Sequence, residues 1–237
     1  RESVEEAAAA YGQEAQKAVT PLLEMDELDI LPDKMPELPS WYHSASLEPP
    51  LLKQGGAISG EALDNLVLML MISKPGEAYP GLELVKRAAA AESLARFAWS
   101  LYQLWHDAGA DSKDYWAFHS LGFLGNDEVV RTLTPLLKKW PGEGAHARAV
   151  QGLDVLTTIG SDIALMHLFG LSQKLKFKGL KAQAGERIQE IALARNITAD
   201  QLADRLVPDL DLDSKGSMTL DYGQRSFTVG FDESLKP

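Results

Sequence analysis

The stretch YWAFHSLGFLGNDEVVRTLTPLLKKWPG, residues 115–142, has the pattern of two helices joined by a tight turn. A second stretch, HARAVQGLDVLTTIGSDIALMHLFGLSQKL at residues 146–175, repeats this design. The turn glycines Gly125 and Gly160 lie 160 − 125 = 35 positions apart. A recurrence of this length, with two antiparallel helices in each unit, is the signature of an α-solenoid. The two stretches therefore predict an all-α fold built from helical-hairpin repeats.

Two known classes of helical repeat have comparable lengths. HEAT-like repeats run about 40–47 residues and tetratricopeptide units about 34. The Trp, Gly, Tyr and Pro positions of the tetratricopeptide pattern are absent, so a HEAT-like α-solenoid is favoured. An earlier pair of helices, residues 58–73 with residues 82–107, would supply a degenerate third unit. A helical bundle without regular repeats is the alternative, because roughly three units are needed for a stable array.

Local signals predict where the helices begin and end. Side chains that offer an oxygen to the free N–H groups of a helix start are expected N-caps, and these are Ser59, Asn126 and Ser161. Thr198 with Gln201 has the spacing of a capping box, which opens a short final helix that ends at Pro208. Gly109 is a natural stop for the helix that begins near Glu92.

Helical periodicity predicts which faces are buried. After Glu92, apolar residues recur at i, i+3, i+4, i+7 and i+11, namely Leu94, Phe97, Ala98, Leu101 and Trp105. The other side of this helix carries Ser93, Arg96, Ser100, Gln103 and Asp107. Residues 162–175 are apolar almost all round, which predicts burial on several sides. Residues 178–195 form a further amphipathic helix.

The period of the pattern changes from helical to 2 near the end of the chain. The alternating apolar residues are Met218, Leu220 and Tyr222, and, after a Gly-containing turn, Phe227, Val229 and Phe231. This pattern predicts a short C-terminal β-hairpin. A lone two-stranded hairpin is marginally stable in water. We therefore expect it to be the start of a further domain.

The predicted organisation has three parts. Residues 1–57 comprise an acidic helix, interrupted at Pro21, and a Pro-rich extended segment that packs on the core. Residues 58–208 form the HEAT-like helical repeat domain, and residues 209–237 form the β-hairpin at the start of a truncated downstream domain. The side chains expected to pin the Pro-rich segment onto the helices are Trp41, Tyr42, Leu47, Leu51 and Leu52.

The overall composition excludes several classes of protein. A formal net charge of −11 disfavours binding to nucleic acid or to anionic membranes unless a local basic patch overrides it. The absence of cysteine excludes disulfides and thiolate metal sites, and fits a cytoplasmic protein. No apolar run approaches the roughly 20 residues needed to span a bilayer, so no membrane partner is expected. The start RESVEE has neither Met nor a signal-peptide pattern, which suggests a fragment of a longer protein.

The candidate binding residues are the lysines of QKLKFKGLK, namely Lys174, Lys176, Lys178 and Lys181. Three of them follow at i, i+4 and i+7, which predicts a basic helix patch. Residues 131–195 hold ten Lys or Arg against five Asp or Glu, so this is the basic region of an acidic chain. Such a patch would meet phosphate or an acidic partner. The alternatives are a solvated face or docking of residues 1–37, which hold ten acids against three bases.

One stretch, DLDLDSKGSMTLDY, imitates a calcium-binding loop. Asp211, Asp213 and Gly216 fill positions 1, 3 and 6 of that motif. Lys215 and Tyr222, however, stand at positions 5 and 12, where an oxygen ligand and a bidentate Glu are needed. A polar turn before the hairpin is therefore the favoured interpretation.

No other motif in the sequence predicts catalysis, a metal or a cofactor. A phosphate loop, a dinucleotide fingerprint, a nucleophile elbow and a zinc signature are all absent. His167 lies in the most apolar helix and is expected to be a hydrogen-bonded core residue. No two histidines stand at i and i+4; they are His43, His106, His119, His146 and His167. The tryptophans expected to serve packing are Trp99, Trp105, Trp116 and Trp140.

The phrases RLVPDLDLD and FTVGFDESLKP, with YPGLELVKRAAAAESLARFAW and LGFLGNDEVVRTLTPLLKKWPGEGAHARAVQGLDVL, carry a resemblance to a bacterial family. Over roughly residues 36–237 the sequence resembles molybdate metabolism regulators, which are WGR-domain proteins with a C-terminal domain of unknown function. The resemblance implies a multidomain parent with an upstream WGR module, associated with nucleic-acid binding, and a HEAT-like helical middle. The tripeptide WGR does not occur here, so that role is not carried onto these residues.

Three functions remain open at this point. The first is a noncatalytic scaffold that holds other domains of the parent protein or a protein partner. The second is a nucleic-acid-contacting module that uses the basic patch. The third is a structural part of an enzyme whose active site lies downstream. The scaffold is favoured, because helices that bury a face against each neighbour explain most of the pattern.

Overall fold

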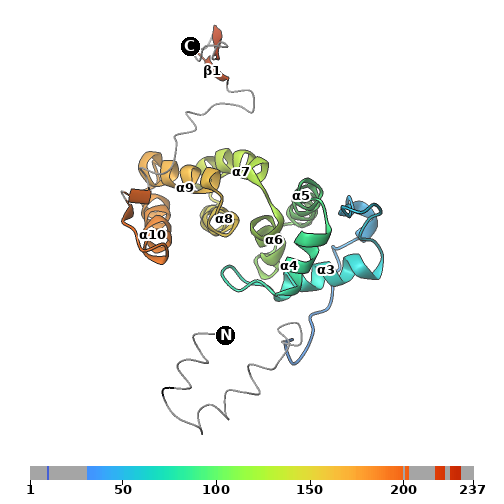
Figure 1. The fold of residues 1–237 in the computed structure, drawn as a ribbon. Coiled ribbons are helices and arrows are strands. Elements are labelled where there is room, and N and C mark those ends of the chain that lie inside the picture. The colour runs from blue at the N-terminus through green and yellow to red at the C-terminus, as the bar shows by residue number, and fades with distance from the viewer. Residues whose placement is uncertain (1–9, 11–30, 200, 203–216, 222–224, 231–237) are drawn as a thin grey trace. The chain divides into compact units, whose positions relative to one another are not determined.

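The computed structural model describes residues 10, 31–199, 201–202, 217–221 and 225–230. The chain divides into two compact units, unit 1 at residues 1–126 and unit 2 at residues 127–237. The described residues form eight α-helices, short 3-10 turns and one two-stranded antiparallel sheet. This confirms the prediction of a mostly helical chain with a short hairpin near its C-terminus (Figure 1).

Unit 1 contains four helices and two 3-10 turns among its described residues. They are η2 (Ser44–Ser46), α3 (Glu61–Ile72), α4 (Gly81–Ala88), α5 (Ala91–Asp107), η3 (Ser112–Asp114) and α6 (Trp116–Leu124). Helix α6 packs on α5 and on α3, and α3 also packs on α4. The largest fully buried side chains of this unit are Trp105, Phe97, Phe118, Leu66, Leu70, Leu82, Leu101 and Leu121.

Helix α5 buries the predicted apolar stripe, whose five members are all 2% exposed or less. Its end is also as predicted: Gly109 has φ of 106°, and its N–H donates to the carbonyl of His106 while the N–H of Ala110 donates to that of Trp105. This is the pattern of a Schellman motif, which favours glycine. Ser93, expected on the polar side, is instead buried, and its Oγ accepts a hydrogen bond from the N–H of Leu51.

The expected helix at residues 82–107 is in fact two helices, α4 and α5. The break lies at Ala89 and Ala90, where the backbone is extended. The N–H of Ala90 donates to the carbonyl of Leu51, and Ala89 forms an antiparallel bridge with Leu52. Backbone groups that pair with a distant segment cannot also pair within a helix, so tertiary contact overrides local propensity here.

The Pro-rich segment is held to unit 1 by both side chains and backbone. Trp41 stacks on Trp116 with ring centroids 5.6 Å apart, and Tyr42 and Leu47 are buried. The side chain of Leu51 is 47% exposed and does not anchor the segment. Its backbone carbonyl instead accepts a hydrogen bond from Ala90 at the α4–α5 junction. The predicted anchor at Leu51 is therefore a backbone anchor.

The predicted N-caps have different outcomes. Ser161 caps α9 as expected, since its Oγ accepts from the N–H of Ala164 at 3.1 Å. Thr198 and Gln201 exchange the two hydrogen bonds of the predicted capping box. The prediction of Ser59 as the N-cap of α3 is wrong. The N-cap is the next residue, Gly60, whose φ is 59°. That left-handed conformation favours glycine over any residue with a side chain.

Unit 2 contains four helices and one 3-10 turn among its described residues. They are α7 (Asp127–Lys139), η4 (Trp140–Glu143), α8 (His146–Ile159), α9 (Asp162–Lys174) and α10 (Lys178–Ala194). Helix α9 packs on α7, α8 and α10, and α8 also packs on α7 and α10. One face of α9 is buried, through Ala164, Leu165, Leu168, Leu171 and Ser172, while Met166, His167 and Phe169 are half-buried. The prediction of burial on several sides is therefore met only in part, because one face of α9 is buried and much of the rest is half-buried.

The predicted pairing of helices into two hairpins is met in part, since α8 packs on α9 but α6 and α7 fall in different units. The sequence predicted α6 with α7 as one hairpin and α8 with α9 as the next. The boundary between the two units instead falls between Asn126 and Asp127, so that α6 belongs to unit 1 and α7 to unit 2. Periodicity identifies the buried face of a helix but not the neighbour that covers it.

The hairpin consists of β1 (Met218–Asp221) and β2 (Ser226–Val229). Met218 pairs with Val229 and Leu220 pairs with Phe227, so these four apolar residues share one face of the hairpin. The predicted helix at residues 1–20, the end of the last helix at Pro208 and the Asp-rich part of the calcium-like loop lie outside the described residues.

Candidate functional site

The four predicted lysines lie on two helices and the turn between them. Lys174 is the last residue of α9, Lys176 lies in the turn, and Lys178 is the first residue of α10. The expectation of one basic helix face is therefore wrong, since α9 ends before Lys178. Lys174, Lys176 and Lys178 are nonetheless all exposed and follow one another around the same turn.

Lys181 differs from the other three lysines. It is half-buried, and its Nζ donates to the carbonyl oxygen of Gln173 at 2.7 Å. That carbonyl belongs to the last turn of α9, whose final carbonyls lack partners within the helix. Lys181 thus closes the end of α9 and ties it to the first turn of α10.

Phe177 brings a second set of basic residues to this turn. Its ring meets the ring of His146 edge-on, with centroids 5.7 Å apart, and it also lies against Gly142. Gly142 lies in η4, between α7 and α8, and His146 begins α8, while Lys138 and Lys139 end α7. Two turns that are separate in sequence are therefore neighbours in unit 2.

We call this surface the basic end, and its members are Lys138, Lys139, Arg148, Lys174, Lys176, Lys178 and Lys181. These seven basic residues face one acid in the same segments, Glu143, which pairs with Lys139 at 2.8 Å. The hydrogen bond and the charge of Glu143 raise the pKa of Lys139. Arg148 lies over the ring of Trp140, with its guanidinium carbon 5.6 Å from the ring centroid.

Acidic residues stand at the opposite end of α7 and α9, in the first turn of each helix. Asp127 begins α7 and accepts a hydrogen bond from Ser161 Oγ at 2.6 Å, so the N-termini of α7 and α9 meet there. Asp162 stands in the first turn of α9. Acids at helix N-termini and lysines at helix C-termini both complement the helix macrodipole. Helices α7 and α9 thus each begin with an acidic residue and end with lysine.

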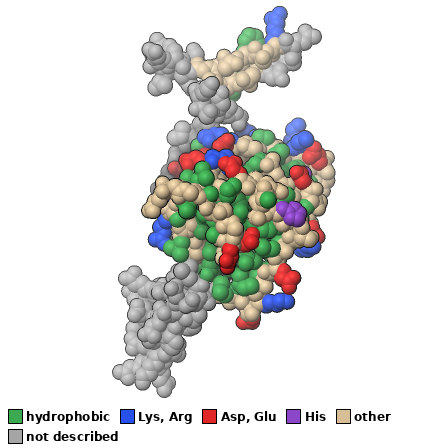
Figure 2. Space-filling view, turned by 90° about the vertical axis from the view of Figure 1, so that its right-hand side faces the viewer, with side chains coloured by type: hydrophobic (Ala, Val, Ile, Leu, Met, Phe, Trp, Pro, Cys, Tyr) green, Lys and Arg blue, Asp and Glu red, His purple; other side chains and the backbone are tan. Residues whose placement is uncertain are grey.

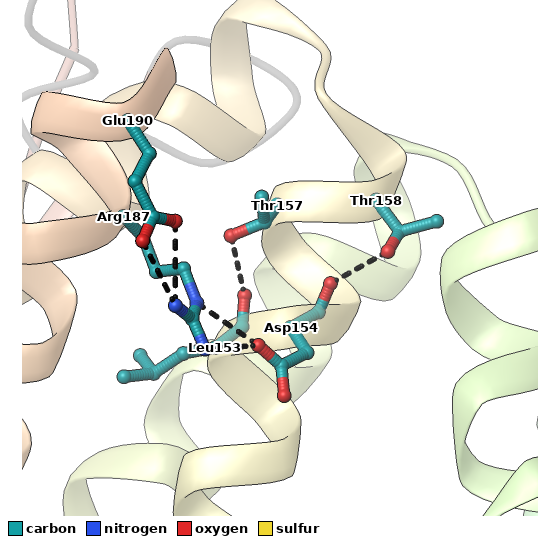
Figure 3. Close-up of polar contacts among 6 residues, drawn as sticks. All are labelled: Leu153, Asp154, Thr157, Thr158, Arg187 and Glu190. Carbon is teal, nitrogen blue, oxygen red and sulfur yellow. Dashed lines mark hydrogen bonds and ion pairs between the residues drawn. The ribbon is translucent and has the colours of Figure 1, made fainter. Parts of the chain in front are cut away.

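A partly buried ion pair joins α8 to α10 (Figure 3). Arg187 contacts Asp154 Oδ1 through Nε at 3.0 Å and through a terminal nitrogen at 2.9 Å, and it reaches Glu190 at 3.3 Å. Burial lowers the pKa of Arg187, but the charges and hydrogen bonds of Asp154 and Glu190 together raise it above its ordinary value. The arrangement is structural, since each charge has a partner within the chain.

Unit 1 offers a second polar cluster, at the Trp41–Trp116 stack. Asp114 is 7% exposed, and its two carboxylate oxygens accept hydrogen bonds from Trp41 Nε1 at 2.8 Å and Trp116 Nε1 at 3.4 Å. The N–H groups of two indoles therefore satisfy this buried carboxylate. This cluster fixes the Pro-rich segment to the start of α6 and offers no group that is free to react.

The remaining sequence candidates are placed as follows. His167 is half-buried rather than a core residue. Trp105, Trp116 and Trp140 are buried and serve packing as predicted, while Trp99 is half-buried. Within the described residues, no group of three or more His, Asp or Glu side chains is placed to hold a metal ion.

Exposed apolar side chains are a further feature of unit 1. Figure 2 shows one face of the molecule, where hydrophobic side chains occupy much of the centre and charged side chains lie both among and around them. The large exposed hydrophobic residues of this unit are Leu31, Met35, Leu51 and Leu84. Apolar surface of this kind is typical of sites that contact another protein surface.

Sequence reasoning missed Lys138, Lys139 and Arg148 as part of the candidate site. They stand about 35 residues before the predicted lysines, a separation close to the repeat length. That spacing was the available signal, because equivalent turns of successive repeats lie on the same side of a helical array.

Comparison with known proteins adds one relative. The chain is 39% identical over 221 residues to the uncharacterized protein YehI of Escherichia coli strain K12, an alignment that covers 93% of this chain. The chain spans 18% of the length of that relative. No protein-family model matches the chain, and no solved structure matches it. In the described part of the chain, none of the helices is long and apolar enough to cross a membrane.

Proposed function

We propose that this chain is a noncatalytic helical-repeat scaffold that holds neighbouring domains of a longer protein. The observation that supports this proposal is the packing of α7 to α10. Helix α7 packs on α8 and α9, and α10 packs on α9 and α8. In an array of two-helix repeats, each helix contacts its own partner and the equivalent helix of the next repeat. Pairs α7–α8 and α9–α10 fit this arrangement, with α7 against α9 and α8 against α10.

The finer proposal is a HEAT-like α-solenoid. Under this proposal, α7–α8 and α9–α10 are two repeats of the solenoid. The packed pair α5 and α6 in unit 1 is a third helical hairpin. The lysines that end both α7 and α9 also agree with this proposal, because successive hairpins present their equivalent turns on one side. A scaffold of this kind folds without a ligand and carries its partners on its surface.

The partners proposed for the scaffold are other domains of the parent protein. Two observations support them: the chain spans 18% of the length of its relative from Escherichia coli, and unit 1 exposes large apolar side chains such as Leu51 and Leu84. Such side chains bury well against a neighbouring domain. Kinship with WGR-domain molybdate metabolism regulators and a cytoplasmic location remain predictions from the sequence.

Cross-linking with mass spectrometry on the full-length parent protein tests the scaffold directly. The expected result is a set of amine cross-links from Lys74 and Lys86 of unit 1 to other domains of the parent. The paired changes Leu51→Glu and Leu84→Glu should reduce these cross-links at least several-fold, whereas Leu193→Glu on α10, which is 73% exposed, should leave them unchanged. Cross-links confined to this chain, and indifferent to all three changes, would contradict the scaffold role.

A further inference from the structure

Four exposed lysines of the basic end have no ion-pair partner in the part of the chain that the structure describes. Among the described residues, no carboxylate forms an ion pair with Lys138, Lys174, Lys176 or Lys178. Glu143 is already paired with Lys139. Like charges that are held close together repel one another, and the cost persists as long as no anion neutralises them.

The position of Lys178 adds to this cost. It is the first residue of α10, whose first turn contains no acidic residue. The N-terminus of a helix carries partial positive charge, so a lysine there is less favourable than an acidic residue. Helix stability therefore does not account for Lys178, and an external anion would account for it together with Lys174 and Lys176.

We propose that the basic end binds the phosphate backbone of double-stranded nucleic acid, using lysines of α7 together with those of the α9–α10 turn. A duplex presents two regular rows of phosphates, and lysine is a point charge that pairs with phosphate without demanding a fixed geometry. The two turns that Phe177 and His146 join offer charges from two separate segments to such rows. This role is additional to the scaffold role, and the experiment that tests it is independent of the cross-linking experiment.

The make-up of the basic end favours a phosphate backbone over a protein partner. Protein interfaces are anchored by aromatic and aliphatic side chains that fill pockets. The large exposed hydrophobic residues of the described chain all lie elsewhere, and they are Leu31, Met35, Leu51, Leu84, Leu193 and Phe227. Single-stranded nucleic acid is a weaker candidate, because its bases stack on exposed aromatic rings. The aromatic ring of the α9–α10 turn, Phe177, is half-buried against His146 and is therefore not exposed for stacking.

The net charge of −11 does not prevent local binding. At physiological ionic strength the Debye length is about 8 Å, so charges farther away are largely screened. Within α7 to α10, acids such as Asp127 and Asp162 begin helices at the opposite end. The field at the basic end is therefore set by its own seven basic residues and by Glu143.

Fluorescence anisotropy with a labelled 20-base-pair duplex tests the proposal. The triple variant Lys174→Glu, Lys176→Glu, Lys178→Glu should bind at least about tenfold more weakly than the unchanged chain, and its log–log salt slope should fall by about 3, one for each lost phosphate contact. The double variant Lys138→Glu, Lys139→Glu should weaken binding as well, because the proposal places both segments on the duplex. Far-UV circular dichroism verifies that each variant remains folded.

A matched control separates local from global charge. Lys34→Glu, Lys74→Glu and Lys113→Glu change the net charge by the same amount at exposed positions of unit 1, and should leave binding nearly unchanged. Equal loss in this control, or no binding to the duplex even at low salt, would overturn the proposal. So would tighter binding to poly-glutamate or to phosphatidylserine vesicles than to the duplex, since those outcomes assign the surface to an acidic protein or a membrane.

Discussion

Gly152 marks the closest approach between α7 and α8. A methyl group at this position would overlap Cδ2 of Leu137 and lie 3.3 Å from its Cγ. Leu137 is fully buried, so it has little room to move. Overpacking of a core costs about 1–3 kcal/mol, which exceeds the gain of about 1 kcal/mol from the better helix propensity of alanine. We expect Gly152→Ala to lower the free energy of unfolding, as measured by urea titration.

Gly185 on α10 is the matched control for Gly152. No atom lies within 4 Å of a methyl group placed there. Gly185→Ala should therefore raise the free energy of unfolding by about 0.5–1 kcal/mol through helix propensity alone. If both substitutions stabilise the chain equally, the close contact between Gly152 and Leu137 is wrong.

The ionisation of Tyr42 is expected to make the free energy of unfolding decrease at alkaline pH. It is buried, and its hydroxyl donates to Asp64 Oδ1 at 2.9 Å. Burial first, and then the hydrogen bond and charge of Asp64, raise the pKa of Tyr42 above its ordinary value near 10. The unfolded chain loses this proton before the folded chain does, so the stabilisation is complete below about pH 10 and is lost as the pH rises further.

Urea unfolding between pH 8 and pH 11 measures this effect. The unchanged chain should lose stability steadily above about pH 10, and Tyr42→Phe, which cannot ionise, should lose less over the same interval. An identical slope for both chains would show that Tyr42 ionises as readily in the folded state as in the unfolded state.

At the scale of the element, the ion pair between α8 and α10 is the contact most open to a direct test. Asp154 and Arg187 expose 17% and 30% of their side chains, so solvent screens the pair only in part. A double-mutant cycle with Asp154→Ala and Arg187→Ala should give a coupling free energy of about 1 kcal/mol. The exposed pair of Arg96 and Glu48, with 50% and 54% exposure, serves as control. Its coupling should be smaller and should vanish at high salt.

The existence of the helices was largely predictable from the sequence, but their partners were not. The stripe of α5, the cap at Ser161 and the stop at Gly109 depend on nearby residues, and these predictions are confirmed. The break at Ala89 depends on backbone pairing with Leu52, 37 positions earlier, which no local pattern encodes. Contacts between distant segments decide such features.

The candidate site shows the same division. The lysines at 174–181 were visible in the sequence as a basic run within an acidic chain. Lys138 and Lys139 lie in the same basic region of the sequence, but their place beside these lysines depends on the contact of Phe177 with His146. The misplaced helix face has a simple cause, since Lys174 and Lys178 have helical spacing although α9 ends between them.

At the scale of the molecule, the two helical units have different surfaces. Unit 1 exposes large apolar side chains and is proposed to hold neighbouring domains. Unit 2 carries a cluster of lysines, the basic end, which is proposed to bind a phosphate backbone. The scaffold proposal depends on the stacking of two-helix repeats, in which each hairpin packs on the next one.

The measurement that tests this stacking most directly is disulfide formation between introduced cysteines, since the chain contains none of its own. Asp127 and Ser161 are in hydrogen-bond contact at 2.6 Å, which joins the N-termini of α7 and α9. Two cysteines can form a disulfide when their Cα atoms lie within about 7 Å. We predict that the pair Asp127→Cys and Ser161→Cys oxidises readily, whereas Asp127→Cys with Ala194→Cys does not. The reverse result would place α7 beside the end of α10, as in a closed four-helix bundle, and would contradict the account.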